Sequence, residues 1–401
     1  MPGRIGKINN IEKFDSQFFD ISTTEAHIMD PATRMLFEHT YEALIDAGIN
    51  PKELWNTRTS VITAISISET RGHMLYDTKL SQLPKNDMSV ANIISHWLGI
   101  TGPSYNIDTA CSSSNYAIVK AYELIRSGDC DTAIVASCNL CFHPKIQYQF
   151  YQLGVLSSDG YCKPFDLEGS GYMRSETAAV LFLQKAKNAR RIYATLVHGK
   201  TNCDGFKAEG ITFPSVEKQK LLLDEFYEEC GISPDELAYM EAHATGTIAG
   251  DPVETMAIDQ SLCAKRTTPL LVGSVKSNLG HSEPASGLCH VVKVILAMET
   301  GIITPTIHFK NPRKNLIGVI EGRIKIVTEP TKLQGDKICI NSFGFGGANS
   351  HILLKSNSKQ KINNGTPDDD LPRLVAVSGR TEEAVKTIFN DVSSICIKLF
   401  F

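Results

Sequence analysis

Residues 106–125 read NIDTACSSSNYAIVKAYELI. The apolar run before the small-residue turn predicts a strand over 105–109, and the apolar spacing after the turn predicts a helix over 112–127. Cys111 thus stands where the helix begins, near amide N–H groups and the positive end of the helix dipole, which favour a thiolate over a thiol. This placement makes Cys111 a candidate nucleophile, with a small buried thiol as the alternative interpretation.

Short β-rich runs alternate with helical runs along the rest of the chain, which indicates an α/β architecture with mostly parallel strands. Further strands are predicted over 60–67, 131–137, 178–184, 192–197, 238–242, 270–275, 324–327, 338–342 and 350–354. Further helices are predicted over 31–47, 215–230, 252–263 and 284–300. The polar, turn-rich stretch 356–372 reads as a linker, and a new strand–helix pattern begins after it.

Composition excludes several classes of protein. The 401 residues carry 40 Lys and Arg against 44 Asp and Glu, a net charge of −4 without a block of like charges, which argues against a nucleic-acid binder with a basic stripe. No run of 18 apolar residues and no secretory signal occur, so membrane insertion is not expected and the protein is expected to be cytoplasmic. Eleven cysteines without an export signal fit reduced thiols better than disulfides.

Three further stretches contain candidate site residues: YMEAHATGTIAGDPVE (239–254), LVGSVKSNLGHSEPASGL (271–288) and INSFGFGGANSHILL (340–354). His243 follows a predicted strand and precedes Thr245 and Thr247, a pattern that aims an imidazole and two hydroxyls at a pocket. Lys276 and His281 flank a tight polar loop before a helix. The glycines of the third stretch allow a backbone N–H to face an oxyanion. Each stretch alone also fits a structural role.

Metal and hydrolase chemistry find little support. Cys138, Cys141 and His143 begin like a zinc motif, but no second pair follows at the required spacing and Cys138 falls in a predicted buried strand. The patterns HExxH, GxSxG, GxGxxG and GxxxxGK[ST] are absent. We therefore expect no metal site.

The four stretches, in this order and spacing, resemble the β-ketoacyl synthase family of decarboxylating condensing enzymes over residues 1–355. Three further segments are similar to animal-type, type I fatty acid synthases more than to modular polyketide synthases: QFYQLGVLSSDG (149–160), CKPFDLEGSGYMRSETAAVLFLQKAKNARRIYATL (162–196) and LPRLVAVSGRTEEAV (371–385). The resemblance implies a transferase that binds no cofactor of its own and receives substrates on the 4'-phosphopantetheine of an acyl carrier domain.

The implied fold is thiolase-like, with two similar α/β halves stacked in α-β-α-β-α layers and a homodimer interface. We place the halves at 1–187 and 188–355, the linker at 356–372, and the start of a region leading toward an acyltransferase domain at 373–401. The family's first strand and helix are expected to be missing, which would leave backbone groups of neighbouring strands exposed and weaken folding.

The resemblance also implies a role for each site residue. Cys111 would carry the acyl group as a thioester, while His243 and His281 would promote decarboxylation of the malonyl thioester. The expected oxyanion hole consists of the N–H groups of Cys111 and Phe345, and Phe345 would also gate access to the nucleophile. Thr245 and Thr247 would bind the pantetheine arm. Lys276 would order the histidine network.

One departure and three alternatives accompany this interpretation. Ala244 replaces the glycine of most relatives and would be strained if the position requires a positive φ. A thiolase shares the fold but typically pairs its cysteine with one histidine and a second cysteine. A modular polyketide synthase ketosynthase, and a non-catalytic fragment that only dimerises or binds carrier, also remain open.

Phe150 and Tyr151 are candidates for setting the depth of the acyl pocket. The basic stretch 185–191 is either a contact for the acyl carrier domain or a solvated face.

Overall fold

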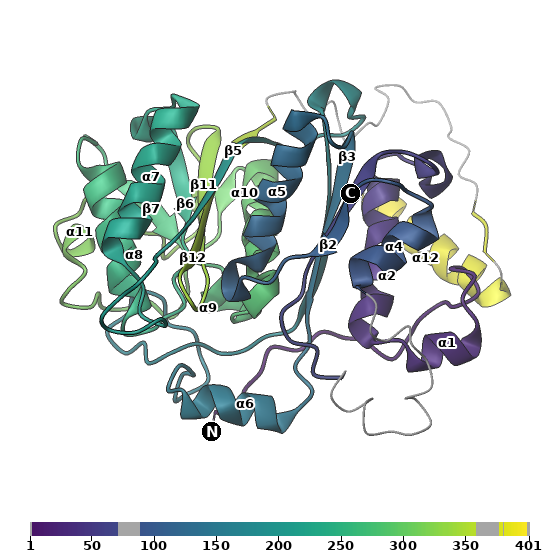
Figure 1. Cartoon of the computed structure of the whole chain (residues 1–401), viewed down its shortest axis with the longest axis horizontal. Coiled ribbons are helices and arrows are strands. Elements are labelled where there is room, and N and C mark those ends of the chain that lie inside the picture. Colours follow the sequence, from purple (N-terminus) through teal and green to yellow (C-terminus); the bar gives the residue numbers. More distant parts are fainter. Residues whose placement is uncertain (1, 71–88, 358–376, 380, 399–401) are drawn as a thin grey trace. The chain divides into compact units, whose positions relative to one another are not determined.

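A computed structural model describes residues 2–70, 89–357, 377–379 and 381–398 (Figure 1). The chain forms two compact units, Met1–Asn357 and Ser358–Phe401. In the second unit, the described part of the chain contains the helix α12 (Glu382–Lys398). The helix predicted after the linker is therefore confirmed, whereas most of the strand predicted before it lies outside the described residues.

The first unit contains a four-stranded sheet with the order β2-β1-β3-β4. Its strands are β1 (Thr59–Ala64), β2 (Ser104–Asn106), β3 (Thr132–Asn139) and β4 (Thr177–Gln184). Strand β1 runs parallel to β2 and to β3, and β4 runs antiparallel to β3. All four strands occur at positions predicted from the sequence.

A six-stranded sheet has the order β5-β12-β11-β6-β7-β9. Its strands are β5 (Ala194–Cys203), β6 (Leu237–Glu241), β7 (Leu270–Gly273), β9 (Ile324–Ile326), β11 (Lys337–Phe343) and β12 (Ala348–Ser356). The strands β11, β6, β7 and β9 are parallel, and β12 and β5 continue the sheet in antiparallel pairs. A separate antiparallel pair joins β8 (Ile302–Ile303) to β10 (Thr331–Lys332).

The helices include all those that the sequence predicts. These are α2 (Pro31–Asp46), α5 (Ser113–Ser127), α7 (Val216–Cys230), α8 (Gly250–Ile258) and α10 (Ser286–Thr300). Further helices are α1 (Thr23–Ile28), α4 (Val90–Leu98), α6 (Pro144–Gln152), α9 (Lys276–Leu279) and α11 (Ile317–Ile320). The helix α2 begins with an Asp30 side chain that caps the amide of Ala32 and with proline at its first position, both common helix-start signals.

The two sheets enclose a layer formed by α5 and α10 (Figure 1). Ile118 of α5 and Val291 of α10 share one buried cluster with Val135 of the first sheet and Ile340 of the second. Helices α2 and α4 pack on the other face of the first sheet, and α7 and α8 pack on the other face of the second. Because successive strand residues point to opposite faces, each sheet supplies apolar side chains to two cores. The layers are those of the thiolase-like fold that the resemblance implies.

In the described residues the first sheet has an open edge at β4 and a strand paired along both edges at β1. Strand β4 ends the order β2-β1-β3-β4 and pairs with β3 alone, so the expectation of exposed backbone groups applies to its other edge. Strand β1 pairs with β3 from Thr59↔Thr132 to Ala64↔Ser137 and with β2 along its other edge. The backbone groups on both edges of β1 therefore have partners, which removes the desolvation cost that an unpaired strand edge would carry. Along the described part of the chain, no helix has both the length and the apolar character needed to span a membrane.

Candidate active site

Cys111 lies in a single 3-10 turn, Ala110–Ser112, between β2 and α5. The preceding Ala110 has a φ of 53°, a left-handed conformation that costs energy for a residue with a side chain. The carbonyl of Cys111 accepts hydrogen bonds from the hydroxyls of Ser286 at 3.1 Å and Ser342 at 3.0 Å. Three segments far apart in the sequence thus fix the backbone of the candidate nucleophile.

The Cys111 thiol is the favoured form in the resting protein. Burial raises its pKa to about 12, and the carboxylate of Glu283 acts in the same direction. The amide N–H of Phe345, which hydrogen-bonds the sulfur, and the nearby Lys276 lower the pKa by less. Desolvation thus opposes the lowering of the thiol pKa that is expected at the start of a helix. The Phe345 amide thus lies close to the Cys111 sulfur, and its part in an oxyanion hole stays a prediction.

His243 follows the end of β6 and is held through its backbone. The amides of His243 and Ala244 donate to the two carboxylate oxygens of Glu254, at 2.8 and 2.7 Å. The side-chain amide of Asn341 donates to the same carboxylate at 2.9 Å. In the described residues, positive φ values at non-glycine positions do not include Ala244, so the strain considered for this alanine does not arise.

His281 packs edge to face against Tyr172 and against His243. The ring centroids are 4.9 Å apart for the first pair and 5.5 Å for the second. Both ring nitrogens of His281 and Nδ1 of His243 are buried without a hydrogen-bond partner among the described residues. Burial lowers the pKa of each histidine well below its usual value, and the charge of Lys276 adds to this. The site therefore contains two neutral imidazoles with ring nitrogens available to a ligand.

Lys276 is buried at the start of α9 and connects two parts of the site. Its Nζ donates to the carbonyl of His243 at 2.5 Å and lies 2.7 Å from Nε2 of His290. Burial lowers the Lys276 pKa to about 8. Sequence reasoning did not identify His290, because a histidine on the inward face of an apolar helix carries no signal of its own.

The two threonines that follow His243 bond to each other. The Thr245 hydroxyl donates to Oγ1 of Thr247 at 3.1 Å, and that oxygen accepts the Gly250 amide at 3.1 Å. Thr245 is buried and Thr247 is half-buried. Both hydroxyls lie on the segment that leads from His243 into α8, and their role toward a ligand stays a prediction.

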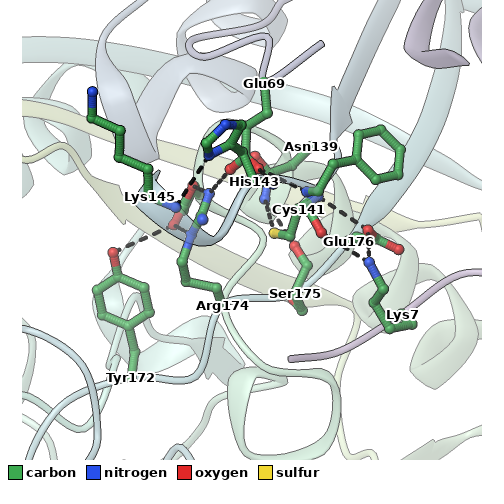
Figure 2. Close-up of polar contacts among 12 residues, drawn as sticks. Lys7, Glu69, Asn139, Cys141, His143, Lys145, Tyr172, Arg174, Ser175 and Glu176 are labelled. Atoms are coloured by element: carbon green, nitrogen blue, oxygen red, sulfur yellow. Dashed lines mark hydrogen bonds and ion pairs between the residues drawn. The ribbon is translucent and has the colours of Figure 1, made fainter. Parts of the chain in front are cut away.

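A buried ion-pair network lies beside His281. Arg174 donates through Nε to Glu283 at 2.6 Å and through Nη2 to Glu69 at 2.9 Å. The second carboxylate oxygen of Glu69 accepts the amides of Phe142 and His143 at 2.7 and 2.6 Å. Figure 2 shows the Arg174 side chain, which comes from the loop before β4, directed toward Glu69. The network anchors Glu283, which stands two residues after His281.

Cys141 and His143 have structural partners. The Cys141 amide donates to Glu176 at 3.0 Å, and Nδ1 of His143 accepts the Lys145 amide at 3.1 Å at the start of α6 (Figure 2). Cys138 is buried in β3, as predicted. Within the described ranges, no group of three His, Cys, Asp or Glu side chains is arranged to hold a metal ion.

A cavity of about 420 Å³ lies between β4, β5, α5 and α10. Apolar side chains such as Phe182, Leu196 and Ile295 form most of its wall. Within the described part of the chain, neither Cys111 nor His243 lines it. This cavity is therefore separate from the candidate active site.

Comparison with known protein families covers almost the whole chain. Residues 2–189 match the beta-ketoacyl synthase N-terminal domain, and residues 193–310 match the beta-ketoacyl synthase C-terminal domain. Residues 312–398 match the ketoacyl-synthetase C-terminal extension. A fatty acid synthase of Anser anser anser is 45% identical over 306 residues, which are 75% of this chain and 87% of that relative. The chain belongs to the β-ketoacyl synthase family.

Other relatives of this ketosynthase come from polyketide synthesis. A hybrid PKS-NRPS synthetase of Aspergillus violaceofuscus is 38% identical over 91% of this chain, which spans 10% of that protein. The solved ketosynthase from module 6 of the bacillaene synthase of Bacillus subtilis 168 superposes with a TM-score of 0.85 at 30% identity, covering 98% of this chain and 68% of that one. The family and the fold are thus shown, and an acyl-transferring condensing function follows at this level, while relatives include both fatty acid and polyketide synthases.

Proposed function

We propose that this ketosynthase is the β-ketoacyl-[acyl-carrier-protein] synthase of a fatty acid synthase. It condenses an acyl group held on Cys111 with a malonyl group held on an acyl carrier domain. The observation that carries the proposal is the convergence of a cysteine, an amide donor and two neutral histidines in one site. The donor is the Phe345 N–H at the Cys111 sulfur, and the histidine rings lie 5.5 Å apart.

The first step is transfer of the acyl group to Cys111. The sulfur attacks the thioester carbonyl on the pantetheine arm, the carbon–sulfur bond to pantetheine breaks, and the thiol proton goes to the departing pantetheine sulfur. The amides of Cys111 and Phe345 would stabilise the oxyanion of the tetrahedral intermediate. Because burial raises the pKa of the Cys111 thiol, we expect this proton transfer to accompany the attack.

The second step is decarboxylation of the malonyl thioester. The malonyl carbon–carboxylate bond breaks, carbon dioxide leaves, and the electron pair becomes an enolate. Neutral His243 and His281 would donate hydrogen bonds to the thioester oxygen as its charge develops. Lys276 would hold His243 through its carbonyl, and Thr245 and Thr247 would bind the pantetheine arm.

The third step forms the new carbon–carbon bond. The enolate carbon attacks the acyl carbonyl on Cys111, the carbon–sulfur bond to Cys111 breaks, and the released thiolate takes up a proton from water. The product is a β-ketoacyl group on the carrier, two carbons longer. A thiolate serves here because it is both a good nucleophile and a good leaving group.

A fatty acid rather than a polyketide product is supported by the higher identity to the goose fatty acid synthase, 45% against 38% for the fungal synthetase. A modular polyketide ketosynthase is the second candidate, favoured by the 0.85 TM-score to a bacillaene ketosynthase. A non-catalytic fragment is less consistent with the presence of Cys111, His243 and His281 together.

We further propose a cytoplasmic homodimer with halves at 1–187 and 188–355, a linker at 356–372 and the beginning of a further region at 373–401. Phe150 is a candidate for the wall of the acyl pocket, since the Arg174 guanidinium lies 4.9 Å from its ring centre beside the buried network. Tyr151 is 42% exposed, which fits such a role less well than the sequence suggested.

The test is a condensation assay with the purified chain. The chain is incubated with malonyl-pantetheine and either acetyl or branched acyl thioesters, and the β-ketoacyl product and released carbon dioxide are measured. We expect straight-chain product, lost in Cys111→Ala and retained in Cys289→Ala, a matched control at another partly buried cysteine. Preference for branched acyl groups would favour the polyketide alternative. Product from acetyl thioesters without malonate would indicate a thiolase.

A further inference from the structure

His290 lies in α10 with a completely buried side chain. The neighbours of His290 on the inward face of the helix, among them Leu288, Val291 and Val294, belong to an apolar core. An imidazole at such a position requires polar partners to offset its desolvation. The partner that the structure provides is Lys276, whose Nζ lies 2.7 Å from Nε2 of His290.

The protonation state of His290 follows from this contact. A lysine nitrogen in contact with a carbonyl acts as a donor there, and Lys276 donates to the carbonyl of His243 at 2.5 Å. If Nζ also donates to His290, then Nε2 is unprotonated and the ring proton sits on Nδ1. Nδ1 is buried without a hydrogen bond of good geometry among the described residues, and the backbone of Asn341 acts on the ring and raises its pKa.

We propose that His290 is a positioning residue for the condensation step: it accepts a hydrogen bond from Lys276, so that this lysine bridges α10 to the strand end that carries His243. The inference rests on the proposed condensing function. The bridge fixes the carbonyl of His243 from one side, while Glu254 fixes its amide from the other. Together they hold the imidazole beside His281 without touching the ring nitrogens that face the substrate.

The electrostatic surroundings are consistent with a neutral acceptor. The acidic and thiol groups that act on Lys276 are Glu241, Glu254, Asp251, Cys111 and Cys162. Burial lowers the His290 pKa well below its usual value, and the charges of Lys276 and Lys293 act in the same direction, while the backbone of Asn341 raises it.

Three variants of the 401-residue chain separate positioning from packing. His290→Leu fills the space without an acceptor, His290→Ala leaves it empty, and His290→Gln retains an acceptor. We expect His290→Leu and His290→Ala to lower kcat for condensation roughly 10- to 100-fold with little change in KM, since a displacement of about 1 Å at a reacting group has that effect. His290→Gln should recover most of the loss. Acylation of Cys111 should be unchanged in all three.

The pH profile adds a readout that a purely structural role would not move. In His290→Leu, the Lys276 ammonium loses a hydrogen-bond acceptor, so the pKa of Lys276 falls. Lys276 then loses its proton at lower pH, and the decline of the decarboxylation rate at alkaline pH moves to lower pH. This decline should return toward the wild-type position in His290→Gln. Equal kcat losses in His290→Leu and His290→Gln, or an alkaline decline at the same pH in all variants, would overturn the inference.

A second measurement is independent of turnover. In protein labelled with ¹⁵N-histidine, we expect His290 as the tautomer protonated at Nδ1, with an Nε2 signal that moves in Lys276→Met. An Nε2-protonated tautomer, or a signal unaffected by Lys276→Met, would refute the bridge. If the wild-type chain does not condense, the proposed function fails, and the NMR result still decides the contact. If the wild type condenses and the variants match it, only the role of His290 fails.

Discussion

The imidazole rings of His243 and His281 lie edge to face, with centroids 5.5 Å apart and ring planes at 88°. The first follows β6 and the second follows α9, so the pair forms only when the second sheet and its connections are complete. His281 is buried and His243 is half-buried. Desolvation lowers the pKa of both rings well below the usual value, which favours the neutral form at physiological pH. Neutral rings can donate a hydrogen bond to an enolate oxygen without the cost of burying an additional cation.

Removal of either imidazole should separate the two half-reactions. In His243→Ala or His281→Ala, we expect release of carbon dioxide from malonyl-pantetheine to fall roughly 100- to 1,000-fold, the usual effect of losing one oxyanion donor. Transfer of an acyl group to Cys111 should continue, because the Phe345 amide stays in place. Radiolabelled malonyl substrate measures the first reaction and intact-protein mass the second. Equal losses in both reactions would contradict the assigned roles.

The alkylation rate of Cys111 should rise steadily with pH. Because burial raises its pKa to about 12, the reactive thiolate is a small fraction at neutral pH and grows about tenfold per pH unit below that value. Iodoacetamide labelling followed by peptide mass analysis gives the rate between pH 7 and pH 9 at about 25 °C. Exposed Cys203 in the same digest is the internal control. A plateau in the Cys111 rate near neutral pH would show an activated thiolate and contradict the prediction.

Gly344 should tolerate no side chain. A Cβ at this position would overlap the carbonyl oxygen of Thr109, which directly precedes the turn that carries Cys111, and would approach Oγ of Ser112 in that turn to 2.7 Å. We expect Gly344→Ala to lower the free energy of unfolding by about 1–3 kcal/mol and to slow acylation of Cys111, since the loop with Phe345 must move away. Denaturant titration and acyl transfer measure the two effects. Gly3→Ala, which meets no atom within 4 Å, is the control, and equal behaviour of the two variants would contradict the packing argument.

The buried Arg174 network should contribute more to stability than a surface pair. Arg174→Met leaves the carboxylates of Glu69 and Glu283 buried without their cation, and breaking such a pair costs about 3–5 kcal/mol. Arg58→Met breaks an exposed pair with Asp131, 3.0 Å apart, and should cost less than about 1 kcal/mol. Urea unfolding of both variants gives the comparison. Similar losses of unfolding free energy in Arg174→Met and Arg58→Met would indicate that the network around Arg174 is solvated.

Local features of the site were predictable from the sequence. The position of Cys111 between a strand and a helix follows from apolar spacing over about 20 residues, and the structure confirms the strand, the turn and the helix. Helix α6 was not predicted, because its Ile, Tyr and Phe residues have moderate helix propensity and the segment has no long periodic run. Helix α4 was also missed, since its Val and Ile residues occur equally in strands.

Features that depend on distant packing were not predictable. The raised pKa of Cys111 results from burial by several segments, whereas the sequence displays only the local helix dipole, which acts in the opposite direction. The contact of His290 with Lys276 depends on how α10 packs against α9. Glu254 likewise looks like an ordinary helix residue until the fold brings its carboxylate to the amide of His243.

The most direct test of the account is the identity of the cysteine that receives the acyl group. The purified chain is incubated with an acyl thioester, digested, and analysed by mass spectrometry for acyl mass on each of its eleven cysteines, with Cys111→Ala as the control. The account predicts a single modified site, Cys111, and no acylation in the variant. Acyl mass spread over several cysteines, or retained in Cys111→Ala, would contradict the claim that this residue is the nucleophile.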